Sequence, residues 1–246
     1  MSSLYFGRTG GTPPVVKNLI IINALMFLAL FGFKAAFGVD LNRELGLFYF
    51  KSPYFEPYQI ITHMFMHGSL GHIFFNMFAL WMFGKVLETV WGGKRFFIYY
   101  MITGLGASAL HMLVNHLQIA SAMKEVAQAY GIDNFSPETV EQLLRRNSAL
   151  AQKVGIGLYV PTVGASGAVF GVLLAFGMLF PNTQLMLLFP PIPIRAKYFV
   201  IGYGILELYL GLTQPGSNIA HFAHLGGMLF GFILIKYWNQ KSNKFY

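Results

Sequence analysis

The stretch TVGASGAVFGVLLAFGMLFPN, residues 162–182, joins a turn of small and polar residues to a long apolar run. Ser166 lies between Ala165 and Gly167, where the apolar run begins. A polar side chain in lipid is costly unless it has a partner or faces water. The position of Ser166 therefore indicates either close helix packing through small residues or a functional site at the mouth of a membrane helix.

The composition of the chain favours a membrane protein. Of its 246 residues, 55% are hydrophobic and 11% are charged, whereas about a quarter of the residues in soluble domains are charged. A helix needs roughly 17 to 25 apolar residues to cross the hydrocarbon core, and the alternation typical of barrel strands is absent. The sequence predicts an all-α polytopic membrane protein with a bundle of six transmembrane helices. Its six apolar runs lie near residues 18–38, 70–90, 95–116, 165–181, 197–214 and 221–238.

Basic residues are unevenly distributed over the two sides that six spans define. The side with both termini has ten of the 17 basic residues and one acid, Glu88, whereas the other side has seven of each. By the positive-inside rule both termini are cytoplasmic, and the net charge of +8 is a topology signal rather than a sign of nucleic-acid binding. We expect a multi-pass protein of a bacterial inner membrane. The ten basic residues are Arg8, Lys17, Lys85, Lys94, Arg95, Arg195, Lys197, Lys236, Lys241 and Lys244.

The chain is predicted to form one membrane domain, residues 18–238, between a cytoplasmic N-terminus, residues 1–17, and a tail, residues 239–246. Residues 117–160 form a polar insertion on the outer side, which is either surface decoration or a docking site for a substrate or partner. Cysteine is absent, so disulfides, thiolate catalysis and cysteine metal sites are excluded.

Two helices are predicted within the insertion. One covers about residues 121–130. The other is capped by Ser136, has Pro137 at its first position, and ends before Gly155.

Glycines are spaced for close helix contact in the fourth and last apolar runs. Small residues four apart let two membrane helices approach backbone to backbone. We expect this approach to bring Ser166 and His224 within hydrogen-bonding distance. The glycines are Gly167 and Gly171 in the fourth run and Gly227 and Gly231 in the last.

These residue types suit nucleophilic catalysis. A serine such as Ser166 becomes a nucleophile when a base takes its proton, and a neutral imidazole such as His224 is the usual base near pH 7. The developing negative oxygen needs donors. His72 and Asn76, four residues apart on one helix face, would supply them with the amide of Ser166. Phe170 would stack on the ring of His224, and since no acid is placed by motif to orient that ring, a Ser–His dyad is predicted.

Taken together, these motifs resemble those of the rhomboid family of intramembrane serine proteases, from about residue 60 onward. The stretch GKVLETVWGGKRFF is similar to the family's loop between the second and third spans, and LFPN with PPIPIRAK to the connection after the fourth. The site motifs that carry the resemblance are Gly164-Ala165-Ser166-Gly167, His67 with His72 and Asn76, and Ala223-His224 with Gly226, Gly227 and Gly231.

The resemblance implies that Ser166, in a water-filled cavity below the outer surface, is the nucleophile. His224 would be the general base and acid, and His72 and Asn76 the oxyanion donors. Substrates would be single-span membrane proteins cut in or near their spanning helix, with no metal or other cofactor. The sequence carries no signal for an oligomeric state. Supporting positions would be Phe170, Gly164, Gly167, Gly227 and Gly231.

The sequence departs from a familiar pattern of this family at two positions. Tyr58-Gln59 stands where some members have Trp-Arg in the first outer loop. Phe170 stands where some relatives have tyrosine, which would keep the stacking on His224 and lose a phenolic hydrogen bond.

Two other functions stay open. His221 and His224 are three residues apart, a spacing that also suits a metal or haem ligand pair, so a histidine-ligated metal-dependent membrane enzyme is one alternative. Against it, an HExxH motif is absent and the spans have few carboxylates. The other alternative is a rhomboid-like protein that binds membrane clients without cutting them, although such relatives usually lack the serine or the histidine.

Further polar residues have expected structural roles. Glu207, the acid of the fifth predicted span, should bond a neighbouring helix near His221, so that replacing it with glutamine costs stability more than turnover. Residues 212–218 contain Pro215 and Gly216 and are expected to form a mobile cap that admits substrate. Three histidines are expected at the membrane interface, namely His63, His111 and His116.

Overall fold

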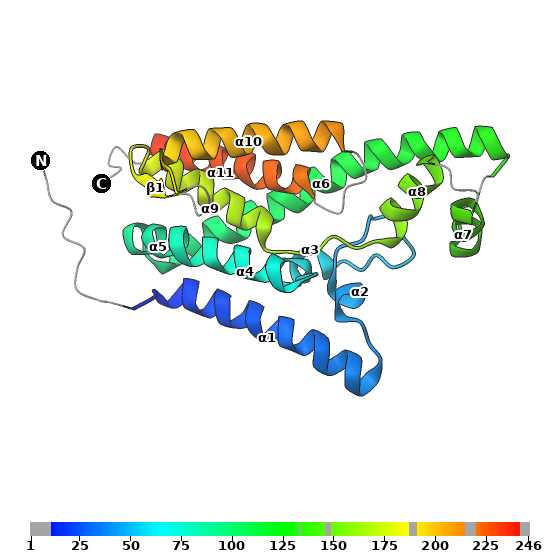
Figure 1. The fold of residues 1–246 in the computed structure, drawn as a ribbon, viewed down its shortest axis with the longest axis horizontal. Coiled ribbons are helices and arrows are strands. Elements are labelled where there is room, and N and C mark those ends of the chain that lie inside the picture. Colours follow the sequence, from blue (N-terminus) through cyan, green and yellow to red (C-terminus); the bar gives the residue numbers. More distant parts are fainter. Residues whose placement is uncertain (1–10, 133, 146–148, 187–190, 215–219, 242–246) are drawn as a thin grey trace, which may run out of the picture.

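The protein was analysed as a computed structural model, in which the described part of the chain is predominantly helical (Figure 1). A helix covers most of each of the six apolar runs, so the helical character predicted for them is confirmed. Most of the predicted cap loop, residues 212–218, lies outside the described residues. The described residues are 11–132, 134–145, 149–186, 191–214 and 220–241.

Three helices of the described chain are long and apolar enough to cross a membrane. α1 (Pro14–Phe37) buries few of its residues and leaves most of its surface free to contact lipid. The second, Leu70–Trp91, is continuous but changes its winding: a π-helical turn, η2 (Leu80–Gly84), separates α4 (Leu70–Ala79) from α5 (Lys85–Trp91). The third is α6 (Gly93–Tyr130), the longest of the three.

The connection between α5 and α6 is the single residue Gly92. Its φ of 79° lies in the left-handed region that glycine adopts without steric cost. The stretch that resembles a family loop is therefore helical on both sides of this residue. On α5, Glu88 accepts hydrogen bonds from the amides of Val15 (2.9 Å) and Val16 (2.7 Å), which anchors the start of α1.

The centre of the bundle consists of α6, α9 (Ser166–Leu179) and α11 (His221–Lys241), because α11 packs extensively against both of the others. α9 is the shortest of the three and is buried along nearly its whole length. α10 (Ala196–Thr213) packs on α11 and α9 from outside and exposes much of its own surface. Figure 1 shows α10 and α1 on opposite sides of this centre.

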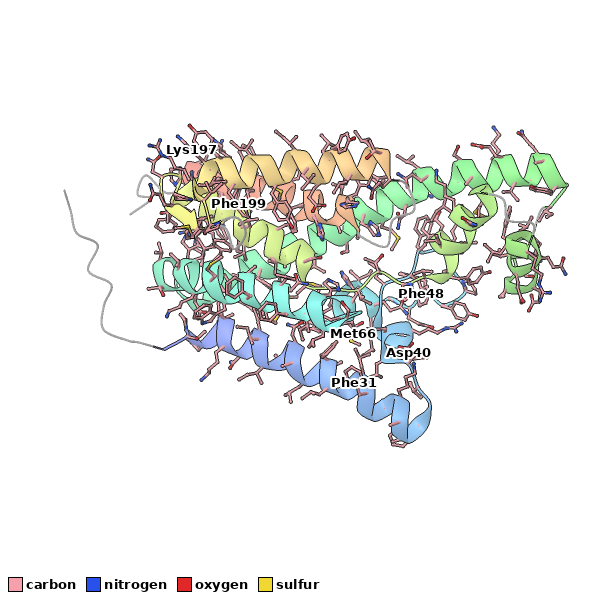
Figure 2. The ribbon with its side chains drawn as sticks, viewed as in Figure 1. Phe31, Asp40, Phe48, Met66, Lys197 and Phe199 are labelled. Carbon is pink, nitrogen blue, oxygen red and sulfur yellow. The ribbon has the colours of Figure 1, made fainter. Side chains whose placement is uncertain are left out.

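A short β-hairpin precedes α10 and is an addition to the predicted all-helical fold. β1 (Gln184–Met186) pairs antiparallel with β2 (Pro193–Arg195), and Leu185 lies opposite Ile194. The hairpin lies within the connection after the fourth apolar run, the segment whose LFPN and PPIPIRAK motifs resemble the family. Lys197, at the start of α10, is at the same end of the bundle (Figure 2).

The loop between α1 and α4 contains three short helices: α2 (Leu41–Leu45), α3 (Gln59–Thr62) and η1 (His63–Phe65). Gln59 is buried and organises this loop. Its Oε1 accepts from the amides of Phe48 (3.3 Å) and Glu56 (3.1 Å), and its Nε2 donates to the carbonyl of Tyr54 (2.9 Å). Figure 2 shows Phe48 and Asp40 toward the end of the bundle away from Lys197.

The polar insertion differs in part from its prediction. α6 continues to Tyr130, so the helix expected over 121–130 is an extension of the third long helix. α7 (Pro137–Arg145) begins as predicted, with Ser136 Oγ accepting from the amide of Thr139 (3.3 Å). The helix end expected at Gly155 is wrong, because this glycine lies inside α8 (Ala149–Tyr159). A Cβ at Gly155 would lie 3.2 Å from Leu144, so glycine here serves close packing of α8 on α7.

Candidate active site

Ser166 is the first residue of α9 and follows a tight turn at Gly164. Gly164 has a φ of 134°, which favours glycine, and its amide donates to the carbonyl of His63 (2.9 Å). A Cβ on Gly164 would lie 2.8 Å from His72 Nε2 and 3.5 Å from Ser166 Oγ. The missing side chain therefore leaves room for the ring of His72 close to the hydroxyl of Ser166.

His224, near the start of α11, faces Ser166 across the contact between the two helices. Its Nε2 is 2.8 Å from Ser166 Oγ, and the histidine is 8% exposed. The helix contact is made backbone to backbone, since any side chain at Gly227 would collide with the carbonyl of Gly167. The structure therefore has the small-residue contact that brings these two helices together.

The other two glycines of the predicted pairs face a different helix. A Cβ on Gly171 would lie 2.6 Å from Thr103 of α6, and one on Gly231 would collide with the phenol of Tyr99, also on α6. The hydroxyl of Tyr99 donates to the carbonyl of Gly171 (2.8 Å). The α9–α11 contact is thus close at one glycine pair, and α6 fills the space beside the other.

Phe170 stacks on one face of the His224 ring. The two rings stack with centroids 4.1 Å apart and an interplanar angle of 5°. Tyr203 of α10 packs on Phe170 in turn, with centroids 5.0 Å apart. This stack fixes the plane of the imidazole.

Glu207 contacts both histidines of the pair, whereas the sequence had placed it only near His221. Glu207 Oε2 of α10 is 2.7 Å from His221 Nδ1 and 3.0 Å from His224 Nδ1. The expected bond near His221 is confirmed, and the same carboxylate also lies close to His224, where no motif had placed an acid. The contact with His221 is a well-aligned hydrogen bond, whereas that with His224 is an electrostatic contact whose angle is less favourable. The signal in the sequence was one acid in the fifth run facing an HxxH pair in the next.

The predicted oxyanion donors lie on α4. His72 lies beside Ser166, as the space at Gly164 indicates, and its ring meets that of His67 edge-on at 5.0 Å. Asn76 is buried, and its Nδ2 donates to the carbonyl of His72 (3.0 Å). The amide of Asn76 is thus engaged within its own helix.

The three histidines expected at the interface have defined partners. His63 is buried, contrary to that expectation, because its Nδ1 bonds the carbonyl of Gln59 (2.8 Å). His111 Nε2 is 2.9 Å from Thr162 Oγ1, and His116 Nδ1 is 2.8 Å from the hydroxyl of Tyr49. A small cavity adjoins the nucleophile candidate, and its polar lining suits water. That polar lining includes His63, Ser108, His111, Thr162 and Ser166.

The histidine pair and Glu207 also form the kind of cluster that binds metals, since one ligand atom from each lies within 4.8 Å of the others. Ligand atoms around a tetrahedral zinc ion with bonds of about 2.0–2.1 Å are roughly 3.3 Å apart. Glu207 Oε2 is nearer than this to both nitrogens, at 2.7 and 3.0 Å. In this arrangement the carboxylate forms a hydrogen bond with His221 and an electrostatic contact with His224.

Most of the chain is similar to a known protein family. Residues 54–240 match the Rhomboid domain family. The chain is 31% identical over 87% of its length to RHOMBOID-like protein 12, mitochondrial, of Arabidopsis thaliana, of which the match covers 55%. It is 28% identical over 75% of its length to Rhomboid protein 1, mitochondrial, of Saccharomyces cerevisiae, covering 43% of that protein.

A bacterial relative gives a similar result. The chain is 27% identical over 72% of its length to Rhomboid protease GluP of Bacillus subtilis, and the match covers 25% of that protein. The chain thus spans about half the length, or less, of these relatives. The family match covers most of the chain, and the relatives that it resembles are named as rhomboid proteins. The chain belongs to the rhomboid family.

Proposed function

We propose that the protein is an intramembrane serine protease that hydrolyses peptide bonds in or near the spanning helix of single-span membrane proteins. The observation that supports this most strongly is the 2.8 Å distance between Ser166 Oγ and His224 Nε2, inside a bundle with long apolar helices. Family membership adds to it, because one relative is named a rhomboid protease. The reaction needs no metal or other cofactor.

In this mechanism Ser166 Oγ attacks the carbonyl carbon of the substrate while His224 Nε2 takes the hydroxyl proton. The protonated ring then gives that proton to the leaving amine, which leaves an acyl ester on Ser166. Water attacks the ester with His224 again as base, and the serine and a carboxylic acid product are released. The cavity beside Ser166 is a fitting source for that water.

Negative charge develops on the substrate oxygen in the tetrahedral intermediate. The amide of Ser166 at the start of α9 and the ring of His72 are suited to donate to it. Asn76 is proposed as a third donor: one N–H of its Nδ2 donates to the carbonyl of His72 (3.0 Å), and the other is left for the substrate oxygen.

The proposed setting is a lipid bilayer crossed by six helices. α1, the Leu70–Trp91 helix and α6 are long enough by composition, and α9, α10 and α11 complete the bundle. The basic excess supports a cytoplasmic position for both termini in a bacterial inner membrane. Two of the relatives are mitochondrial by name, and in that organelle the same rule would direct the basic end to the matrix.

The test is cleavage of a model single-span substrate by the protein purified in detergent. Ser166→Ala and His224→Ala should each lower the cleavage rate by at least about 1000-fold, because each removes a reacting group. Ser136→Ala is the matched control: it removes a hydroxyl at the start of another helix, α7, and should leave the rate unchanged.

Each alternative function predicts a different result. Cleavage that survives both site substitutions, or that a chelator abolishes, would favour a metal enzyme. Stable capture of the substrate without cleavage, together with no labelling of Ser166 by a fluorophosphonate, would favour a client-binding protein.

A further inference from the structure

We propose that Glu207 is a positioning residue for His224, so that the site works as a Ser–His–Glu arrangement in which one carboxylate serves both His221 and His224. This inference rests on the proposed protease function. It adds α10 to the helices α4, α9 and α11 that carry the other groups of the proposed reaction. The contact that carries it is the 3.0 Å distance from Glu207 Oε2 to His224 Nδ1, on the edge of the ring opposite the nitrogen that faces Ser166.

The contacts around His224 leave its ring a single orientation. Phe170 stacks on one face, Ser166 meets Nε2, and the carboxylate meets Nδ1. An ionised carboxylate can only accept, so the proton of the neutral ring belongs on Nδ1. Nε2 is then free to accept the proton of Ser166, as the reaction requires.

His221 holds the carboxylate in place. Its Nδ1 donates to Glu207 Oε2 over 2.7 Å, and both side chains are about 5% exposed. Histidines three apart on α11 lie on the same helix face, so one oxygen can contact both rings. A buried acid without such partners would be costly in a membrane protein. The pair His221–Glu207 therefore forms a fixed support for the edge of His224.

The carboxylate has its largest effect during proton transfer. When His224 takes the serine proton it becomes an imidazolium ion, and the nearby negative charge stabilises that ion more in a low-dielectric interior than in water. The contact with His224 is less well aligned than that with His221 in the resting arrangement. A charged ring would strengthen it. Glu207 would thus act on the chemical step rather than on substrate binding.

The experiment measures kcat and KM for Glu207→Gln with a single-span substrate, together with the rate at which a fluorophosphonate labels Ser166. Glutamine keeps the size of the side chain and removes its charge. In place of the mainly structural effect expected from the sequence alone, kcat and the labelling rate should fall by about 100-fold or more, with KM within about 2-fold of the parent. Glu207→Asp keeps the charge on a side chain one methylene shorter, and should keep between about a tenth and a half of the parent kcat.

Glu88→Gln is the matched control, because Glu88 is also buried but bonds backbone amides of α1. It should lower the melting temperature while kcat and labelling stay near the parent values. Parent-like kcat in a folded Glu207→Gln protein would overturn the inference. Should that variant fail to fold, Glu207→Asp decides: a reduced kcat at unchanged KM supports the inference, and a parent kcat overturns it.

The two proposals fail separately. If Ser166→Ala keeps cleaving, the serine-protease mechanism itself is wrong. If Ser166→Ala and His224→Ala are inactive while Glu207→Gln is fully active, the protease function stands and only the role of Glu207 is refuted.

Discussion

Two glutamates are buried in the described part of the chain, and they do different things. Glu88 of α5, 3% exposed, accepts from two backbone amides at the start of α1. Glu207 of α10, 4% exposed, contacts two imidazoles. A backbone amide does not act as an acid or base near pH 7, whereas an imidazole can take a proton from a reacting group and return it. Similar burial of the same residue type therefore serves helix docking in one place and, in the proposed mechanism, chemistry in the other.

The two glutamates also hold their helices in different ways. Glu88 offsets the positive end of the dipole of α1 and satisfies two of its free amides. Glu207 joins a peripheral helix to the central α11. The first contact should therefore be visible in stability and the second in rate, and the variants below test this division from the largest effect to the smallest.

The reactive end of the molecule should be the most sensitive to a single methyl group. In Gly227→Ala the new methyl would collide with the carbonyl of Gly167 and push α11 away from α9. We expect cleavage to fall by at least about 100-fold, because misplacement of a reacting group by about 1 Å has that cost. Gly202→Ala on α10 is the control, since no atom lies within 4 Å of its added Cβ. Equal rates for the two variants would contradict the close contact.

Substitution of Glu88, which docks the start of α1, should change the stability of the protein but not its cleavage rate. Glu88→Gln keeps one acceptor oxygen and loses the charge, while the amides of Val15 and Val16 both need a partner. A loss of about 2 kcal/mol is expected for weakening such charge-assisted bonds, which corresponds to a drop in melting temperature of about 4–8 °C. A strong decrease in kcat at a temperature where the variant is folded would break the contrast with Glu207.

The aromatic stack should have a smaller effect. Phe170→Leu removes the ring that lies parallel to His224 at 4.1 Å. Stacking is worth about 0.5–1.5 kcal/mol, so kcat should fall by about 2- to 12-fold. Phe170→Tyr keeps the ring and should stay near the parent. A larger loss in the tyrosine variant than in the leucine variant would show that the stack is not what matters.

The smallest effect is expected far from both glutamates, at α7. The hydroxyl of Ser136 bonds Glu138 and lowers the pKa of that carboxyl below its ordinary value of 4.5. A group with a lowered pKa stabilises the fold above its ordinary pKa, and that contribution disappears as the pH falls through the lowered value. Ser136→Ala should weaken α7 by about 1 kcal/mol and remove part of its acid sensitivity, without changing kcat.

Hydrogen exchange of the α7 amides at several pH values measures this difference. If the parent and the Ser136→Ala protein lose protection alike as the pH falls, the hydrogen bond to Glu138 does not contribute to the stability of α7.

Much of the helical layout could be predicted because its causes are local. Apolar runs of sufficient length set the helices, and small residues at a spacing of four indicated the contact between α9 and α11. The proximity of Ser166 and His224 follows from that contact alone. Family motifs at the same positions made the prediction specific.

Other features depend on packing between distant segments and were missed for that reason. Gly155 was expected to end a helix, but it lies inside α8, where an added Cβ would come within 3.2 Å of Leu144 on α7. His63 is buried since Gln59 bonds its ring. Glu207 reaches His224 only because α10 packs on α11 in one rotational setting, which helical spacing within either sequence does not determine.

In the proposed mechanism, the location of Glu207 on α10 would link substrate entry to reactivity. Ser166 and His224 belong to the buried centre, whereas α10 is attached from outside. A displacement of α10 that opened a lateral path for a substrate helix would also withdraw the carboxylate from His224. Ser166 would then be unreactive while the lateral path is open and would become reactive again when α10 returns. This coupling would protect other membrane proteins that pass the open site from cleavage.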